Sequence, residues 1–370
     1  MTTAWTCEHV RGIAGQAVAR LPELAPDRFA RPRPDLYYWD MWPVQDCDGR
    51  IARIADRELW MVLCAPDNGD PAARHFAAKI HLLRRDGDRW SDLGPALPEF
   101  SGPYEREWSG SAIWADGQFT LWFTGAGLSA RPGGYQQALF ETTARTDGEG
   151  LPEGWTEPKH ILADPFPEYL AADAHEGEAG RIKAYRDPAY FRDPADGREY
   201  LAFTASRAWS DSEYTGAIGL AVRNGGDWRL LPAPIHSGGV NNELERAHIV
   251  YRDGAYLAFW ATQSSTFATA LREAPTGLYG MVADSVTGPY RPLNGTGLVL
   301  ANPAGLPCRE YSWSVTRELV VSSFVDRPDP DCREFVGAPA PLSRLDVDPV
   351  SARAIPFGWL EDAAHRGVIE

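Results

Sequence analysis

Hydrophobic and polar residues alternate in short runs along most of the chain, and turn-forming residues interrupt each run. The run "RELWMVLCAP" is followed by Asp, Asn and Gly, and "QFTLWFTGAG" follows an Asp-Gly pair. Short alternating runs bounded by Gly, Pro and Asp-Gly are typical of β-strands joined by tight turns. Only residues 5–21 and 167–179 show a helical pattern. The chain is therefore predicted to be all-β.

One arrangement of strands recurs five times along the sequence. Each unit has a short strand, a turn, a more hydrophobic strand that ends in aromatic residues, and a less hydrophobic strand that leads to a turn. The units begin with "DGRIARIADRELWMVLCAP", "SAIWADGQFTLWFTGAG", "PAYFRDPADGREYLAFTAS", "AHIVYRDGAYLAFWATQ" and "YSWSVTRELVVSSFVDR". This repeat predicts a five-bladed β-propeller that spans residues 1–370 as one domain, although a β-sandwich of hairpins would give a similar pattern. In a propeller, the starts of the innermost strands converge on a central funnel.

The composition excludes several classes of protein. The 370 residues carry a formal net charge of -15, whereas binding to DNA, RNA or anionic lipid requires a basic surface. No apolar run is long enough to cross a membrane, and the first residues lack the apolar core of a signal peptide. We expect no nucleic-acid partner and no membrane partner. The expected location is the cytoplasm, or the exterior of the cell by a route without a cleaved signal.

The metal-binding and disulfide-forming residues are scattered. The five cysteines are Cys7, Cys47, Cys64, Cys308 and Cys332. Their odd number and the lack of a C-x-x-C pair argue against a disulfide framework or a zinc site, with one bridge between Cys308 and Cys332 left open. His248 is expected to be a packed strand residue, and no acidic cluster clearly marks a calcium site. We therefore predict no metal.

Acidic residues stand at the starts of three of the five units. Asp40 lies among four aromatic residues in "LYYWDMWPVQ", Asp187 lies in "YRDP", and Glu243 and Glu245 lie in "NNELERAH". Taken singly, each acid could belong to a turn, an exposed strand face or a buried ion pair. Together at a funnel they match a glycosidase, in which one carboxylate attacks and a second carboxyl group, whose pKa is raised by apolar surroundings, protonates the leaving oxygen.

At these residues the sequence resembles glycoside hydrolase family 68, the levansucrases, inulosucrases and related β-fructofuranosidases. The resemblance covers about residues 5–360 and is strongest to the Gram-negative type of levansucrase. It rests on "YWDMWPVQDCDG", "EREWSGSAIW", "YRDPAYF", "NNELERAHIVYRDGAYLAF", "LYGMVADSVTGPYRPLNGTGLVLANP" and "EYSWSVTRELVVSSFVD", in that order. It implies a five-bladed β-propeller with a central funnel and a retaining cleavage of sucrose.

The resemblance also implies roles for individual residues. Asp40 would be the nucleophile that forms a fructosyl-enzyme, Asp187 would stabilise the transition state, and Glu245 would protonate the departing glucose oxygen and then deprotonate the acceptor. Trp39, Trp108 and Ser109 would line the fructosyl subsite, with Ser109 bonded to Asp40, while Arg186, Glu243, Arg246 and Tyr311 would hold hydroxyls of the donor. No cofactor is implied, although some family members bind a structural calcium ion.

Two positions depart from the family pattern. Gln263 stands where a His or Arg tied to chain elongation is common, and Trp313 in "YSWS" stands where a His is common. Both changes are expected on the acceptor side, so the fructosyl group could pass to water, to a sugar or to a growing fructan. Two other functions stay open: a non-catalytic propeller that binds glycans, and a hydrolase of another fructoside or furanoside.

Overall fold

The computed structural model describes residues 2–25, 28–128, 134–172 and 182–360. Strands dominate these residues, as the alternating pattern predicted. The helix expected over residues 5–21 is much shorter, because α1 (Cys7–Arg11) passes into the 3-10 turn η1 (Gly12–Gly15) and Gln16 is extended. Glycines weaken a helix at this point. In the second expected helix, residues 167–172 form a turn and a bridge at Tyr169, and residues 173–179 lie outside the described part.

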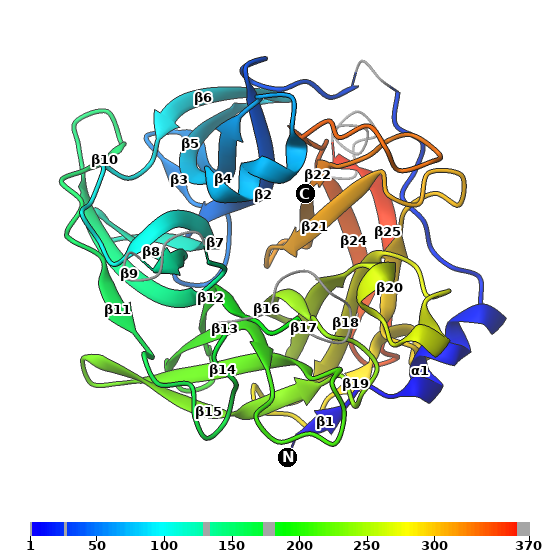
Figure 1. Cartoon of the computed structure of the whole chain (residues 1–370). Coiled ribbons are helices and arrows are strands. Elements are labelled where there is room, and N and C mark those ends of the chain that lie inside the picture. Colours follow the sequence, from blue (N-terminus) through cyan, green and yellow to red (C-terminus); the bar gives the residue numbers. More distant parts are fainter. Residues whose placement is uncertain (1, 26–27, 129–133, 173–181, 361–370) are drawn as a thin grey trace.

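The strands form four sheets (Figure 1). The largest sheet has ten strands, namely β2 (Leu36–Gln45), β3 (Arg53–Ile54), β4 (Arg57–Pro66), β5 (Lys79–Asp86), β6 (Arg89–Pro95), β7 (Tyr104–Ala115), β8 (Gln118–Leu128), β9 (Gln137–Thr146), β10 (Pro152–Glu153) and β11 (Lys159–Ile161). The second contains β12 (Tyr185–Arg192), β13 (Glu199–Ser206), β14 (Gly216–Asn224), β15 (Asp227–His236) and β1 (Thr3–Ala4). The third contains β16 (Glu245–Arg252), β17 (Ala255–Thr262), β18 (Gly277–Ala283), β19 (Arg291–Pro292) and β20 (Leu298–Ala301). The fourth contains β21 (Glu310–Val315), β22 (Val320–Val325), β23 (Ala338–Pro339), β24 (Ser343–Asp348) and β25 (Arg353–Trp359). The remaining 3-10 turns are η3 (Pro71–Phe76), η4 (Ser264–Thr266), η5 (Thr269–Leu271) and η6 (Leu293–Gly295).

Five strands lie nearest the middle of the molecule and form a ring (Figure 1). Strand β2 contacts β7, β7 contacts β12, β12 contacts β16, β16 contacts β21, and β21 contacts β2. Each of these strands begins an antiparallel group, and the ten-stranded sheet is two such groups joined where β2 and β7 pair in parallel. Each repeated unit of the sequence therefore falls within one of these antiparallel groups.

Each strand of the ring is interrupted by a β-bulge where it pairs with the next strand of its group. The register shifts lie between Trp39 and Trp42, Trp108 and Gly110, Arg186 and Ala189, Glu245 and His248, and Tyr311 and Ser314. Four residues at these bulges have left-handed backbone angles: Asp40 (φ 48°), Asp187 (φ 59°), Arg246 (φ 51°) and Ser312 (φ 61°). A bulge bends the strand and changes the direction of its side chains, which is why bulges occur next to active sites. The bulges therefore bring polar side chains to the axis.

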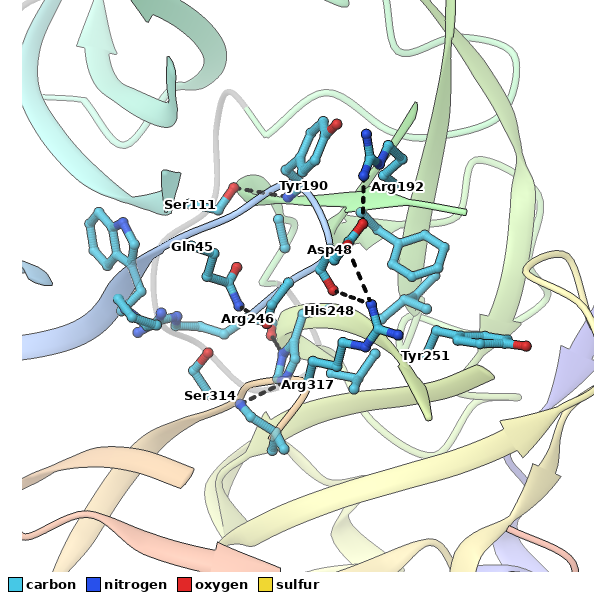
Figure 2. Close-up of a pocket in the computed structure, with 18 of the residues that line it drawn as sticks. Gln45, Asp48, Ser111, Tyr190, Arg192, Arg246, His248, Tyr251, Ser314 and Arg317 are labelled. Atoms are coloured by element: carbon cyan, nitrogen blue, oxygen red, sulfur yellow. Dashed lines mark hydrogen bonds and ion pairs between the residues drawn. The ribbon is translucent and has the colours of Figure 1, made fainter. Parts of the chain in front are cut away.

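A rear cavity, lined mostly by residues that follow the bulges, is bordered by ion pairs (Figure 2). The Asp48 carboxylate lies 2.5 Å from the Arg192 guanidinium and 3.9 Å from that of Arg317, so one acid ties three strand groups together. His248 accepts a hydrogen bond from the Val315 amide at Nε2 (2.9 Å) and lies 2.8 Å from the Arg246 carbonyl at Nδ1, as expected of a packed strand residue. These contacts hold together the strand ends that follow the bulges.

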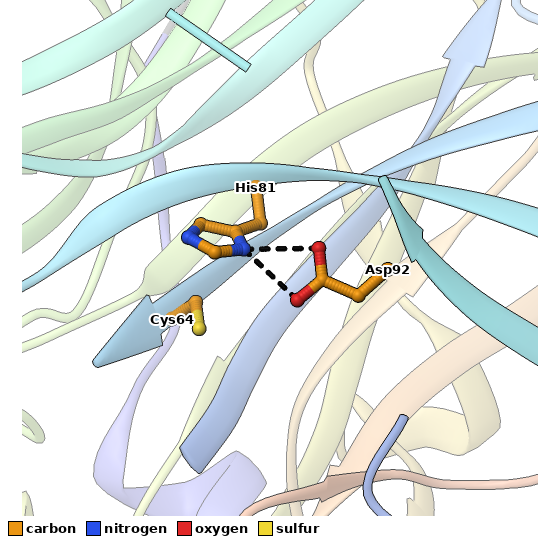
Figure 3. A group of neighbouring side chains, drawn as sticks. All are labelled: Cys64, His81 and Asp92. Atoms are coloured by element: carbon orange, nitrogen blue, oxygen red, sulfur yellow. Dashed lines mark hydrogen bonds and ion pairs between the residues drawn. The ribbon is translucent and has the colours of Figure 1, made fainter. Parts of the chain in front are cut away.

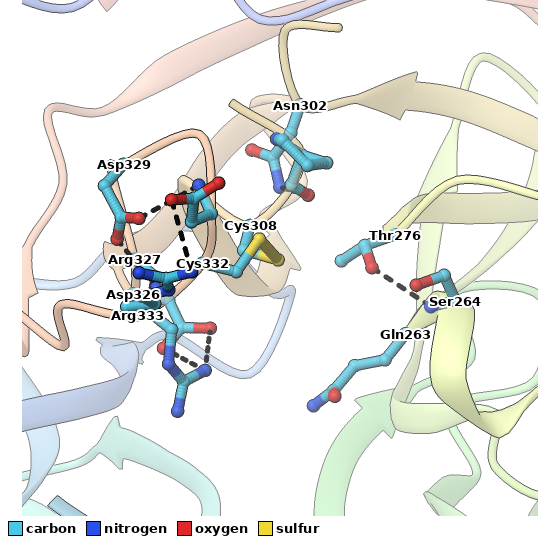
Figure 4. The surroundings of a disulfide bond; sticks show 12 residues. Gln263, Ser264, Thr276, Asn302, Cys308, Asp326, Arg327, Asp329, Cys332 and Arg333 are labelled. Atoms are coloured by element: carbon cyan, nitrogen blue, oxygen red, sulfur yellow. Dashed lines mark hydrogen bonds and ion pairs between the residues drawn. A yellow bond between two sulfur atoms is a disulfide. The ribbon is translucent and has the colours of Figure 1, made fainter. Parts of the chain in front are cut away.

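A disulfide joins Cys308 to Cys332, with the Cα atoms 5.6 Å apart (Figure 4). The sequence did not decide whether this bridge forms, and the structure contains it. The enclosed segment includes Asp329, whose carboxylate accepts hydrogen bonds from the amides of Arg333 and Glu334. It leads to Phe335, which packs against Tyr37 with ring centroids 5.1 Å apart. The bridge therefore fixes a loop that packs beside the strand carrying Asp40.

Replacing both disulfide cysteines should lower the stability of the fold. The bridge spans 24 residues of sequence, and the lost restraint on the unfolded chain corresponds to about 3 kcal/mol in the chain-entropy description. We expect Cys308→Ala/Cys332→Ala to lower the free energy of unfolding by about this amount in denaturant titrations without reductant. The half-buried free thiol of Cys47 offers a control, since Cys47→Ser should change little. Equal midpoints for wild type and the double variant would contradict the expectation.

Candidate active site

A pocket of about 520 Å³ opens at the front of the ring. Its wall contains ten of the eleven site residues predicted from the sequence: Trp39, Asp40, Trp108, Ser109, Arg186, Asp187, Glu243, Glu245, Gln263 and Tyr311. These residues come from all five strands of the ring and from the loops beside them. The pocket therefore assembles side chains that lie more than 270 positions apart in the sequence.

Ser109 connects two carboxylates at the floor of the pocket. Its hydroxyl lies 3.1 Å from Asp40 Oδ2 and 2.7 Å from Asp187 Oδ1, so both acids compete for one proton. The bond from Ser109 to Asp40 is the one expected from the resemblance. Asp40 also accepts a hydrogen bond from Ser312. One hydroxyl thus fixes the relative positions of the two acids.

Asp187 is held by several further donors. The Thr204 hydroxyl donates to its Oδ2 at 2.9 Å, and the Nε of Arg186 lies 3.3 Å from the same oxygen. Its own amide donates to the Thr124 hydroxyl at 2.8 Å, which fixes the backbone at the bulge. These contacts fix the position of the Asp187 carboxylate beside Asp40.

Opposing influences act on the Asp40 carboxyl group. Burial raises the pKa of Asp40 above the ordinary value, and the negative charge of Asp187 raises it further. The Arg246 guanidinium and the hydrogen bonds from Ser312 and Ser109 lower the pKa. Burial disfavours the charged form because the group loses its hydration, and the cation and donors favour that form. The result is a poorly hydrated carboxylate, which is a better nucleophile than a fully solvated one.

Glu245 is buried as well, but the charge that affects it most is a neighbouring acid rather than a cation. Burial, reinforced by the negative charge of Glu243, raises the pKa of Glu245 to about 8, although the Arg186 guanidinium, 3.1 Å away, favours ionisation. Arg186 cannot neutralise both acids, because its Nη2 also pairs closely with Glu243. The Tyr311 hydroxyl makes a short hydrogen bond to the second oxygen of Glu245. Glu245 is therefore protonated at neutral pH, as a general acid must be.

The geometry joins a carboxylate nucleophile candidate and a protonated carboxylic acid in one pocket. This division of roles between two acids is the arrangement that glycoside cleavage requires. The model of glycoside hydrolase family 68, described as levansucrase/invertase, matches residues 1–215 and 209–354. The chain belongs to this family.

Individual relatives in family 68 are similar over most of the chain. An extracellular sucrase from Zymomonas mobilis is 30% identical over 363 residues, which cover 88% of this chain and 86% of that protein. A levansucrase from Rahnella aquatilis is 28% identical over 343 residues, 79% of each chain. The structure of the inulosucrase from Halalkalicoccus jeotgali bound to kestose superposes with a TM-score of 0.87 at 34% identity, covering 97% of this chain and 96% of that one.

Arg246 is the predicted site residue that the structure does not bring to the pocket. Its guanidinium lies behind Asp40, within hydrogen-bond distance of Ser312 Oγ (3.2 Å) and the Met41 carbonyl (3.3 Å), and it lines the rear cavity (Figure 2). The structure therefore places Arg246 outside the wall of the pocket, and the contact with donor hydroxyls stays a prediction. The bulge at Arg246 turns its side chain away from the side that Glu245 faces. Its positive charge still affects the site, because it lowers the pKa of Asp40.

Of the two departures from the family 68 pattern, only one lies at the pocket. Gln263 is exposed at the rim, where an acceptor would enter. Trp313 is fully buried and packs edge-on against Tyr311, with ring centroids 5.9 Å apart, so the expectation that it faces the acceptor is wrong. The left-handed Ser312 between them sends the two rings to different surroundings.

Arg74 and His75 also line the pocket, although no sequence pattern pointed to them. Both belong to η3, whose first turn is capped by Asp70 through the Ala72 amide (3.0 Å). The His75 ring lies edge-on to Trp39 and Trp108, with centroids 6.1 and 6.3 Å away. Burial and then the Arg74 charge lower the pKa of His75 to about 3, so its imidazole is neutral. The Asp-Pro pair before η3 could have indicated a short helix but not its direction.

Proposed function

We propose that this protein cleaves sucrose by a retaining, fructosyl-transferring mechanism on a five-bladed β-propeller. The observation that carries the proposal is that one pocket contains both Asp40 and Glu245, whose pKa is raised to about 8. Family membership and the names of the relatives, among them sucrase, levansucrase and inulosucrase, support sucrose as the donor. The ring of five strand groups supports the propeller assignment.

In the first step, a carboxylate oxygen of Asp40 attacks the anomeric carbon of the fructosyl group while the bond to the glucose oxygen breaks. Glu245 gives its proton to that oxygen, and glucose leaves. Asp187 and Ser109 lie beside Asp40, where a fixed negative charge stabilises the oxocarbenium-like transition state. The products of this step are glucose and a fructosyl ester of Asp40.

In the second step, the ionised Glu245 removes a proton from the acceptor hydroxyl, and the acceptor oxygen displaces Asp40. Both carboxyl groups return to their starting states, so the cycle uses no cofactor. The acceptor approaches from the rim, where Gln263 and Lys183 lie. Water gives fructose, and a sugar hydroxyl gives a longer fructoside.

The deciding experiment is incubation of the purified protein with sucrose and measurement of glucose and fructose over time. We expect glucose release from wild type and its near-complete loss in Asp40→Asn. Equal amounts of glucose and fructose identify hydrolysis, and an excess of glucose identifies transfer. No glucose from wild type, with sucrose still bound in calorimetry, would replace the proposal with a glycan-binding function.

We also propose that the protein works outside the cytoplasm. The Cys308–Cys332 disulfide is of the kind that persists in oxidising compartments. The Zymomonas mobilis relative carries the name extracellular sucrase. None of the helices in the described residues is long and apolar enough to cross a membrane. Fractionation of the source cells, followed by detection of the protein outside them, tests the location.

The rate of sucrose cleavage should follow a bell-shaped pH profile. Glu245 must be protonated in the first step, and its pKa of about 8 places the alkaline limb there, because the acid is lost as pH rises. Asp40 must be ionised, and its raised pKa places the acid limb above the range of an ordinary aspartate. The measurement is kcat/KM for sucrose across pH. A rate that stays constant well above pH 8 would contradict the role of Glu245.

A further inference from the structure

Three side chains of different chemistry meet within the first strand group, away from the sugar pocket (Figure 3). The Cys64 sulfur, a ring nitrogen of His81 and a carboxylate oxygen of Asp92 all lie within 4.8 Å of one another. In the part of the chain that the structure describes, no other group of three such side chains is so compact. Cys64 is 2% exposed, and the Asp92 side chain is 1% exposed.

The strand register places these side chains on one face of the sheet. Cys64 of β4 pairs with Lys79 of β5, while His81 lies two residues further along the same strand and is a diagonal neighbour of Cys64. Asp92 lies on β6, where a register shift opposite His81 separates the pairs His81–Pro95 and Leu83–Asp92. The cluster is thus built by three successive strands, and no short sequence motif marks it.

The carboxylate of Asp92 is already oriented by groups outside the cluster. The Tyr38 hydroxyl donates to Oδ2 at 2.7 Å, and the Gly94 amide donates to Oδ1 at 2.7 Å. The Nδ1 of His81 lies 3.0 Å from both oxygens. Outer hydrogen bonds of this kind fix the ligands of protein metal sites and are needed for tight binding. The cluster therefore has supporting contacts as well as candidate ligands.

We propose that Cys64, His81 and Asp92 bind a structural zinc ion. Sulfur and imidazole donors suit zinc, whereas calcium and magnesium take oxygen ligands. A thiolate and a carboxylate together balance the charge of a divalent cation, so the buried site is neutral when filled. Zinc–ligand bonds of about 2.0–2.3 Å bring neighbouring ligand atoms to within about 3.6 Å, so the cluster closes by about 1 Å.

Filling the site rearranges two protons. The Nδ1 of His81 carries a proton when it bonds the carboxylate, and zinc takes the place of that proton while Nε2 acquires one from solvent. The Cys64 thiol gives its proton to solvent, so one proton is released for each ion bound. Zinc is four-coordinate, so three protein ligands leave the fourth position to a water molecule.

The zinc site is independent of the sugar pocket. Tyr38 and Cys64 belong to the apolar cluster that includes Val320 of β22, whereas their chain neighbours Trp39 and Leu63 face the pocket on the other side of the sheet. Zinc should therefore raise the midpoint of thermal unfolding without changing sucrose cleavage. Metal content can be read whether or not the protein proves to be a fructosyltransferase.

The test uses the full chain, freed of metal with a chelator and dialysed against zinc chloride or cobalt chloride. We expect one zinc ion per chain, a higher unfolding midpoint, and a thiolate-to-cobalt absorption band. Cys7→Ser/Cys47→Ser leaves Cys64 as the only free thiol, because Cys308 and Cys332 are bonded to each other. This variant should keep both the ion and the band, and Cys64→Ser should lose them.

Several outcomes would overturn the zinc site. They are no bound ion in wild type, loss of the cobalt band in Cys7→Ser/Cys47→Ser, or equal zinc content in wild type and Cys64→Ser. Each would leave the three residues as a hydrogen-bonded packing cluster. If Cys64→Ser does not fold, the result for Cys7→Ser/Cys47→Ser decides alone, since its substitutions lie outside the cluster.

Discussion

Asp40→Asn should abolish sucrose cleavage with little effect on the fold. The amide has nearly the shape of the carboxylate, and Asn tolerates the left-handed backbone angle of 48° that position 40 requires. Ser109 can still donate to the amide oxygen. The amide is a poor nucleophile and carries no charge, so we expect kcat to fall by about 10⁴-fold or more. Glucose release measured under saturating sucrose gives the value.

The matched control for this substitution is Asp116→Asn. Asp116 also has a left-handed backbone angle (φ 51°), but it is exposed in the turn between β7 and β8. Its activity and its unfolding midpoint should equal those of wild type. If Asp116→Asn lost activity as Asp40→Asn does, the loss would come from placing Asn at a left-handed position and not from removing a nucleophile. If Asp40→Asn kept wild-type activity, Asp40 could not be the nucleophile.

Residues at strand starts could be predicted from the sequence because the repeat specifies where they meet. Asp40 and Asp187 stand at the same position of their bulges, Glu245 stands one position earlier in its own, and the pocket contains all three. The sequence does not reveal which way a residue at a bulge points. Arg246 directly follows Glu245, and only the local backbone sends its side chain to the rear cavity.

Other features depend on contacts between distant segments, which no local pattern records. His75 reaches the pocket because η3 folds across the start of the ring, where Trp39 and Trp108 enclose it. The helix expected over residues 5–21 has a suitable apolar pattern, yet α1 ends at Arg11, Gly12 and Gly15 lie in a 3-10 turn, and Gln16 is extended. The cluster of Cys64, His81 and Asp92 was missed for the same reason, since its members come from three strands.

Glu245→Gln should lower kcat for sucrose by about 10²–10⁴-fold, since the amide cannot protonate the glucose oxygen. Tyr311 can still donate to the amide oxygen, so the pocket should keep its shape. The loss should depend on the leaving group. With fructosyl fluoride, fluoride departs without a proton, and the first step should be much less impaired. An azide anion, which needs no base, should restore the second step.

Glu243→Gln separates the acid/base role of Glu245 from the effect of charge around it. Glu243 is the like charge that helps raise the pKa of Glu245, and Arg186 would pair more fully with Glu245 once it is removed. Because both changes favour ionised Glu245, the alkaline limb of kcat/KM should move to lower pH and remain visible. In Glu245→Gln the same limb should disappear. A limb that persists there would assign the proton to another group, with Tyr311, which touches Glu245, as the first to test.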